Sequence, residues 1–160
     1  MSLTESALLT ATNGRLEEVF RSSPAGEVPR GPMEGTAILA AGTRLVRPLA
    51  ALVRLAVWQG KVFSPESGYL SNRVGPFETL AVLATVAPGP SLLDERACLV
   101  IDYSRTSLVA RGIRDEIRQV GPGLYLGLVW LFGRSRAGWF TLRTPENDGG
   151  TGRDRAQPER

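Results

Sequence analysis

The chain has 160 residues, of which 42% are hydrophobic and 22% are charged, and this composition fits one globular domain with a single core. It contains no histidine and one cysteine, Cys98, which excludes from a lone chain an internal disulfide, histidine-bound zinc or haem, a Ser-His-Asp triad and a Cys-His nucleophile. The net charge is +3, but the arginines are dispersed and lack an interleaved aromatic platform, so we expect no nucleic-acid partner.

The N-terminal segment Met1–Leu9 lacks the basic region and the apolar core with a cleavage site that are typical of a secretory signal. The longest apolar stretches, Leu49–Trp58 and Leu124–Phe132, reach about half of the roughly 20 residues that a spanning helix requires. We therefore expect a cytoplasmic protein without a transmembrane segment. Arginine is used almost to the exclusion of lysine, with Lys61 the single lysine, which indicates GC-rich bacterial coding.

The N-terminal region predicts short helices. Thr4–Thr12 suits a first helix that Asn13-Gly14 stops or restarts, and Arg15–Arg21 places apolar residues at i, i+3 and i+4. That stripe consists of Leu16, Val19 and Phe20. A lid or a membrane-surface anchor is one interpretation. A helix that plugs one end of a sheet is favoured, because the polar face mixes both signs of charge.

The next segments predict a strand, a helix and a second strand between two loops. Ser22–Pro32 is a loop by its Pro, Gly and Ser content, and Glu34–Ala41 is a strand. Pro48 suits the first residue of a helix that runs to about Trp58, and Gln59–Phe63 suits a strand. Ser64–Pro76 is predicted as a second polar loop, long enough to be functional.

Two further strands are predicted before the strongest local signal. Phe77–Ala87 is strand-like and is expected to end at Pro88-Gly89-Pro90, and Ala97–Ser104 is rich in β-branched residues. Arg105–Gly112 is expected to connect this strand to the following hairpin.

The strongest local signal is a hairpin. Charged and apolar residues alternate through Ile113–Val120, Gly121-Pro122-Gly123 supplies turn chemistry, and Leu124–Phe132 returns as an apolar run. Ala137–Arg143 is the last predicted strand. Thr144–Arg160 is Pro, Gly and charge, and we expect a disordered tail.

Six or more strands joined mainly by tight turns, with one helix between the first two, predict a curled antiparallel sheet. Closing such a sheet into a barrel removes its exposed edges. The predicted fold is therefore mainly β, a barrel formed by residues 1–143 and followed by the tail at 144–160. A barrel of about eight strands can hold one small ligand.

The segment Leu49–Glu66 carries a Leu-rich stretch followed by a Trp-x-Gly-Lys-x-Phe run, which consists of Trp58, Gly60, Lys61 and Phe63. This segment resembles the middle of the bacterial GXWXG-domain family, and Asp115–Leu131 resembles a strand-turn-strand in the second half of that family. The resemblance covers about two thirds of the chain and implies a calycin-like β-barrel of unassigned biochemistry. The naming motif would fall around Gly35, where this sequence lacks both the Trp and the second Gly. The broader similarity is to lipocalin-like proteins, including small barrels that enclose polyketide or terpenoid substrates.

Lys61 and Asp115 are the candidate catalytic residues. On an ideal strand Lys61 faces opposite to Trp58, and an apolar interior would lower its pKa and make it a base or a Schiff-base amine. Pairing with a carboxylate, or reaching out to water, is the more prosaic interpretation. Asp115 shares a face with Ile113 and Ile117, which suits either a general acid or base with a raised pKa or, as the favoured alternative, a structural Asp paired to Arg.

The alternation also assigns neighbouring residues to faces. Arg114, Glu116 and Arg118 form the opposite face of the same strand and are predicted to be an exposed charge ladder. Cys98 is expected to be a small buried hydrophobe.

Tyr103 shares an apolar face with Leu99 and Ile101, and is expected to line the interior. Tyr125 and Trp130 fall on opposite faces of their strand, so one of them should contact a cavity. Core packing is the alternative for each aromatic residue. The predicted ligand-binding set is Trp58, Phe63, Asn72, Tyr103, Tyr125 and Trp130, with Asn72 at the rim of a mouth.

The leading functional hypothesis is binding of a small lipophilic metabolite in the barrel cavity. The first alternative is a cofactor-independent isomerase or cyclase that acts on a polyketide or terpenoid-like substrate in the same cavity. The second alternative is a protein-interaction module. We expect no cofactor and no metal, because neither clustered carboxylates nor a nucleotide-binding motif is present, and a homodimer is compatible with the sequence.

Overall fold

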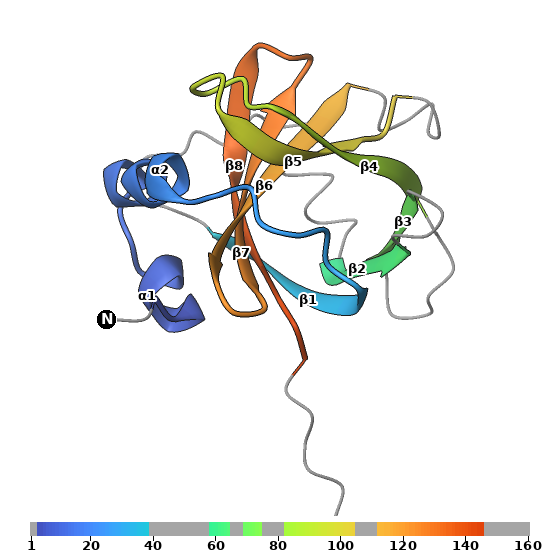
Figure 1. The fold of residues 1–160 in the computed structure, drawn as a ribbon, viewed down its shortest axis with the longest axis horizontal. Helices are drawn as coiled ribbons and strands as arrows, with labels where there is room; N and C mark the ends of the chain where they lie inside the picture. Colours follow the sequence, from blue (N-terminus) through green and yellow to red (C-terminus); the bar gives the residue numbers. More distant parts are fainter. Residues whose placement is uncertain (1–2, 39–57, 65–68, 75–81, 105–111, 146–160) are drawn as a thin grey trace, which may run out of the picture.

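The computed structural model describes residues 3–38, 58–64, 69–74, 82–104 and 112–145, and for 58–61, 69–74 and 82–83 it describes the backbone only. Two short helices precede a closed barrel of antiparallel strands that follow one another in sequence order, with β1 paired to β8 (Figure 1). The elements are α1 Glu5–Leu9, α2 Asn13–Ser22, β1 Gly31–Ile38, β2 Trp58–Ser64, β3 Tyr69–Val74, β4 Val82–Pro90, β5 Ala97–Asp102, β6 Ile113–Gly121, β7 Leu124–Leu131 and β8 Ser135–Arg143. The prediction of a mainly β, barrel-like fold is confirmed.

The predicted helix break between Thr12 and Arg15 has a clear cause in the structure. Thr12 is the N-cap of α2, and its side chain accepts a hydrogen bond from the Arg15 amide at 3.3 Å, just as Thr4 caps α1. The predicted stripe of α2 is buried. The stripe packs against the outside of the barrel wall and not into one of its ends, so the expected plug is wrong in its location.

The predicted hairpin is confirmed as β6 and β7, which pair from Ile113 and Leu131 to Gly121 and Leu124. Two other boundaries differ from the prediction. β1 starts earlier than predicted and covers Gly31–Ile38, and the strand expected to end before Pro88 continues to Pro90. β3 pairs with β4 only as far as Thr85, so beyond that point β4 is bonded to β5 alone, where proline is tolerated.

The predicted loop Ser64–Pro76 is wrong, because it contains β3, Tyr69–Val74, which pairs with both β2 and β4. Pro and Gly residues flank this short strand on both sides, and they led to the prediction of a loop for the whole segment. Asn72 is therefore a strand residue and not part of a loop. The helix predicted between Pro48 and Trp58 falls mainly within residues 39–57, which lie outside the described residues, as does the predicted tail beyond Pro145.

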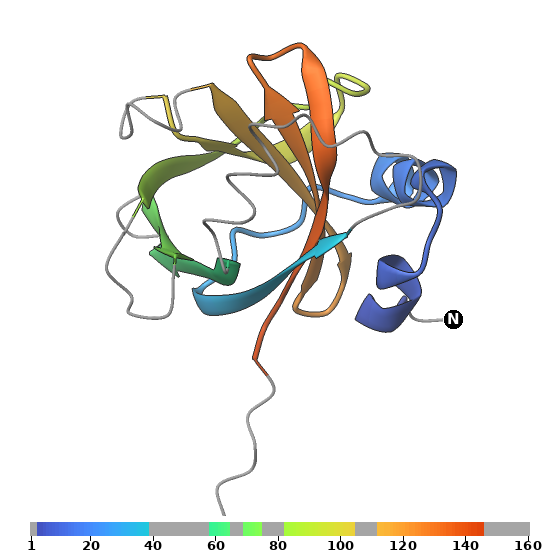
Figure 2. The ribbon, with the colours of Figure 1, turned by 180° about the vertical axis from the view of Figure 1, so that it is seen from behind.

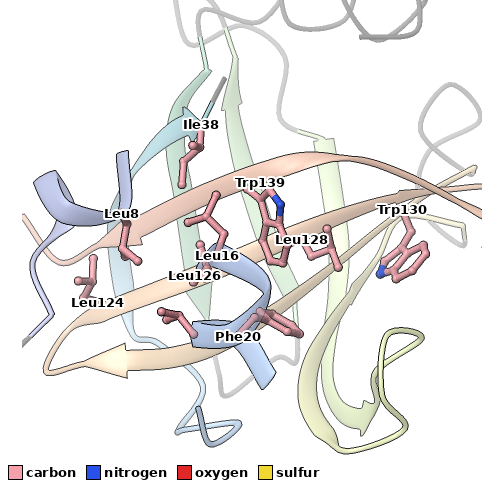
Figure 3. Close-up of a cluster of buried hydrophobic side chains, with 10 residues drawn as sticks. Leu8, Leu16, Phe20, Ile38, Leu124, Leu126, Leu128, Trp130 and Trp139 are labelled. Atoms are coloured by element: carbon pink, nitrogen blue, oxygen red, sulfur yellow. The ribbon is translucent and has the colours of Figure 1, made fainter. Parts of the chain in front are cut away.

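The barrel wall separates two apolar clusters. The interior cluster contains residues of seven strands and includes Met33, Phe63, Leu99, Ile117 and Leu142. The outer cluster lies between the helices and the outside of β7, β8 and β1 (Figure 3). Its members are Leu8, Leu16, Val19, Phe20, Ile38, Leu124, Leu126, Leu128, Trp130 and Trp139. In Figures 1 and 2 both helices lie at one side of the barrel, and β2 to β4 form the opposite wall.

The predicted exposed charge ladder on β6 is wrong, because Glu116 and Arg118 are both 0% exposed. Arg118 forms an ion pair with Asp94 and donates a hydrogen bond to the Phe20 carbonyl at 2.9 Å. Glu116 accepts hydrogen bonds from the Ser91 hydroxyl and the Leu92 amide. The helix α2 and the turn at residues 91–96 thus cover the outer face of β6, and each buried charge has a partner.

Candidate functional site

One end of the barrel is crossed by the segment that links α2 to β1. We call residues 24–30 the strap. In Figure 1 the strap passes in front of β6 and β7 before the chain enters β1. The Pro24 carbonyl accepts a hydrogen bond from the Gln119 amide at 3.1 Å, and the Glu27 carbonyl accepts one from the Tyr125 hydroxyl at 2.8 Å. Two bonds to the inner wall therefore hold the strap across the end at which β6 turns into β7.

Gly26 lets the strap approach this closely. Its φ is +75°, and a Cβ atom built on it would lie 2.4 Å from the Cβ atom of Gln119. Both the backbone conformation and the space therefore favour glycine over any other residue at this position.

A pocket of about 540 Å³ lies beneath the strap. Its apolar wall includes Val28, Pro29, Met33 and Tyr125, of which Met33 and Tyr125 belong to the interior cluster. The complete lining is Gly26–Arg30 with Met33, Gln119, Gly123, Tyr125 and Thr144. The pocket thus borders the interior cluster through Met33 and Tyr125, and it carries the charged residues Glu27 and Arg30.

Tyr125 is the sequence-predicted site residue that the structure places in this pocket. It is 4% exposed, and burial raises the pKa of its phenol, to which the Glu27 carboxylate adds a smaller effect. The phenol is therefore neutral at physiological pH and serves as a hydrogen-bond donor to the strap. Sequence reasoning missed the strap residues and Met33, because the segment before β1 reads only as a Pro- and Gly-rich loop.

A second polar feature lies deeper in the barrel. Tyr103 and Asp115 are 3% and 5% exposed, and the Tyr103 hydroxyl donates a hydrogen bond to Asp115 Oδ2 at 3.0 Å. The prediction that Tyr103 lines the interior is confirmed by its membership of the interior cluster. Asp115, which the sequence places on one face with Ile113 and Ile117, is therefore buried beside a partner.

The interior wall next to this pair is not filled by the described side chains. Asp115 pairs in register with Val129, which pairs with Gly138 on the next strand, and Val129 is only partly buried. A Cβ atom built on Gly138 would have no described atom within 4 Å. Ala37 pairs with Phe140 of the interior cluster and is nevertheless exposed. Within the described ranges, no side chain therefore fills the inner face of β8 beside Gly138.

For three predicted site residues, Trp58, Lys61 and Asn72, the structure describes the backbone alone. Lys61 pairs in register with Met33 on one side and with Asn72 on the other, so two of the three occupy neighbouring strand positions. A register shift between Trp58 and Gly60 pairs Trp58 with Val74, so the backbone of β2 is not the ideal strand on which the opposite faces of Trp58 and Lys61 were predicted, and that expectation stays a prediction.

The remaining predicted residues divide between the two faces of the wall. Phe63 is 2% exposed in the interior cluster. Trp130 lies in the outer cluster instead, so it does not line the interior (Figure 3). Its Nε1 atom is buried without a hydrogen-bond acceptor among the described residues. Cys98 is 0% exposed, as expected of a small buried hydrophobe, and burial raises the pKa of its thiol to about 12.

The described part of the chain contains no group of three or more Cys, Asp or Glu side chains arranged to hold a metal ion. No helix within the described ranges has the length and apolar character needed to cross a membrane.

No protein-family model and no curated protein matches the sequence. Among solved structures, the chain is similar to a protein from Thermomonospora curvata that is described only as a crystal structure of a protein from that organism. The two share 19% sequence identity with a TM-score of 0.56, over 85% of this chain and 89% of the other. At that level of identity the similarity shows the fold and carries no function.

Proposed function

We propose that this protein binds a small, largely apolar metabolite inside the barrel, and that the ligand enters beneath the strap. The observation that carries this proposal is the pocket of about 540 Å³, whose inner wall is formed by Met33 and Tyr125. Small-molecule sites typically have volumes of about 300–1,000 Å³ and apolar walls with a few polar groups. The pocket has the volume of such a site, and Met33 and Tyr125 contribute to its apolar part.

The apolar area that a ligand buries sets an upper bound on the expected affinity. A ligand that buries about 300 Å² of apolar surface would gain roughly 7 to 8 kcal/mol, at about 25 cal/mol per Å². Association entropy reduces this value, so the upper bound is micromolar affinity. Titrations should therefore extend to at least tens of micromolar ligand.

The test is a titration with a neutral lipophilic fluorophore, N-phenyl-1-naphthylamine. We expect saturable binding to the wild type and at least tenfold weaker binding to Val28→Trp, because the indole occupies part of the pocket beneath the strap. Thr36→Trp is the matched control, since Thr36 is an exposed residue of β1 that does not line the pocket. Circular dichroism checks that both variants fold. Equal binding by the wild type and a folded Val28→Trp variant, or no binding by the wild type, would rule out the proposal.

A second candidate function is proton transfer to or from a bound substrate, as in a cofactor-independent isomerase or cyclase. The observation that favours it is the buried pair formed by Tyr103 and Asp115, close to the inner wall at Gly138, which no described side chain fills. In this scheme the Asp115 carboxylate takes a proton from a carbon next to a carbonyl group and returns it elsewhere, while the Tyr103 hydroxyl orients the carboxylate.

This alternative is tested by following deuterium exchange into an aryl 1,3-diketone by NMR. Catalysed exchange that is lost in Asp115→Asn, with fluorophore binding retained, would support an enzyme. Exchange at the uncatalysed rate with the wild-type protein would leave binding as the function.

A further inference from the structure

The charged residues of the strap give the pocket a chemical preference. Glu27 and Arg30 are the charged side chains that line it, and both are exposed at its rim. Neither takes part in an ion pair with another described residue, whereas Arg118 and Asp94, or Arg143 and Glu5, are paired. The pocket therefore presents charges that the fold does not use.

Arg30 is the better partner for a ligand of opposite charge. It lies between Pro29, which is buried and has a ring that restricts φ, and Gly31 at the start of β1. Its guanidinium can donate two parallel hydrogen bonds to one carboxylate, and such bidentate pairs are the stronger kind of charged contact. For an ammonium group, the described lining of the pocket offers one oppositely charged partner, the exposed carboxylate of Glu27.

The charge of the whole chain also favours an anion. The chain as a whole carries a net charge of +3, which raises the local concentration of small anions.

We infer that the ligand of the strap pocket is an amphipathic carboxylate, with its apolar body against Met33 and Tyr125 and its carboxylate at Arg30. This inference rests on the proposed function, because it specifies the ligand class of the same pocket. It predicts that ligands with the same apolar body are discriminated by the charge of their polar group.

The experiment compares 2-naphthylacetic acid, 2-naphthylacetamide and 2-(2-naphthyl)ethylamine as competitors of N-phenyl-1-naphthylamine, at low and at high salt. We expect the acid to bind about five- to tenfold more tightly than the amide at low salt, with a smaller preference at high salt. Arg30→Gln should abolish this preference, so that the acid and the amide bind with similar affinity. Arg134→Gln removes the same charge from the exposed turn between β7 and β8, outside the pocket, and should retain the preference.

The possible results separate this inference from the proposed function. Equal binding of the three competitors would overturn the inference and leave the binding function intact. Tightest binding of the amine, lost in Glu27→Gln, would do the same. Failure of the fluorophore and of all three competitors to bind would overturn both.

Discussion

Arg118 offers the sharpest test of how the barrel and its outer layer are joined. Its guanidinium is 0% exposed and forms two hydrogen bonds with Asp94, of 2.8 and 2.7 Å. It also donates to the carbonyl groups of Phe20, Arg96 and Ala97, and its guanidinium carbon lies 4.6 Å from the centre of the Phe20 ring. One side chain of β6 thus connects α2 and the turn at residues 91–96.

Arg118→Met replaces this side chain with an apolar one of similar length. The substitution leaves the Asp94 carboxylate, which is 7% exposed, without its cation, and leaves three carbonyl groups without their donor. Removing one partner of a buried ion pair typically reduces stability by about 3–5 kcal/mol. We expect a loss in this range in the free energy of unfolding, measured by urea denaturation and followed by tryptophan fluorescence.

Arg136→Met is the matched control. Arg136 bonds to Glu17 of α2, but its side chain is 49% exposed, so we expect a loss of at most about 1 kcal/mol. The double variant Arg118→Met, Asp94→Leu should recover part of the loss, because it removes the unpaired carboxylate. If Arg118→Met and Arg136→Met were equally stable, the assignment of Arg118 as the main polar link would be refuted.

Three further predictions follow from single contacts. Gly127→Ala should destabilise the protein by about 1–3 kcal/mol, because the new Cβ atom would lie 2.2 Å from the ring of Phe140. Gly138→Ala should be nearly neutral, because no described atom lies within 4 Å of its new Cβ atom. Equal changes in melting temperature for the two variants would contradict this reasoning. Burial raises the pKa of the Cys98 thiol to about 12. The thiol should therefore resist 5,5'-dithiobis(2-nitrobenzoate) at pH 8 in the folded protein and react with it in guanidinium. Rapid labelling of the native protein would contradict the burial of Cys98. The hydrogen bond from Arg118 lowers the pKa of Asp94 below the ordinary 3.8, so its stabilising contribution is fully present above pH 3.8 and is lost as the pH falls through the lower pKa of the folded state. The free energy of unfolding should therefore fall less steeply with acid in Asp94→Asn than in the wild type, and equal slopes would argue against this pair.

The sequence was informative where local pattern and tertiary environment agree. The alternation in β6 and the turn at Gly121–Gly123 predict the β6–β7 hairpin, and the spacing of Leu16, Val19 and Phe20 predicts the buried stripe of α2. Tyr103 was assigned to the interior correctly, since the face it shares with Leu99 is apolar. In each case the residues that pack against the core recur with the period of the strand or helix to which they belong.

Local pattern was misleading where a second layer covers the barrel. Period-2 alternation identifies the two faces of a strand, but it does not say whether the polar face meets water. Glu116 and Arg118 are buried because α2 and the turn at residues 91–96 fold over them, and this is a contact between distant segments. Trp130 was ambiguous for the opposite reason, since both faces of β7 are apolar and one of them lies under the helices.

The same outer layer determines where the strap pocket forms. α2 ends at Ser22, and two residues later the Pro24 carbonyl accepts a hydrogen bond from the Gln119 amide on β6. Arg118, the neighbour of Gln119 in the chain, holds the Phe20 carbonyl in the last turn of α2. Adjacent residues of one strand therefore anchor the helix on the outer face and the strap at the barrel end. Arg118 and Gln119 are consecutive residues of β6. A loss of the Arg118 contacts should therefore loosen the strap as well as the helix. The charge buried outside the barrel is in this way part of what positions the strap that borders the pocket.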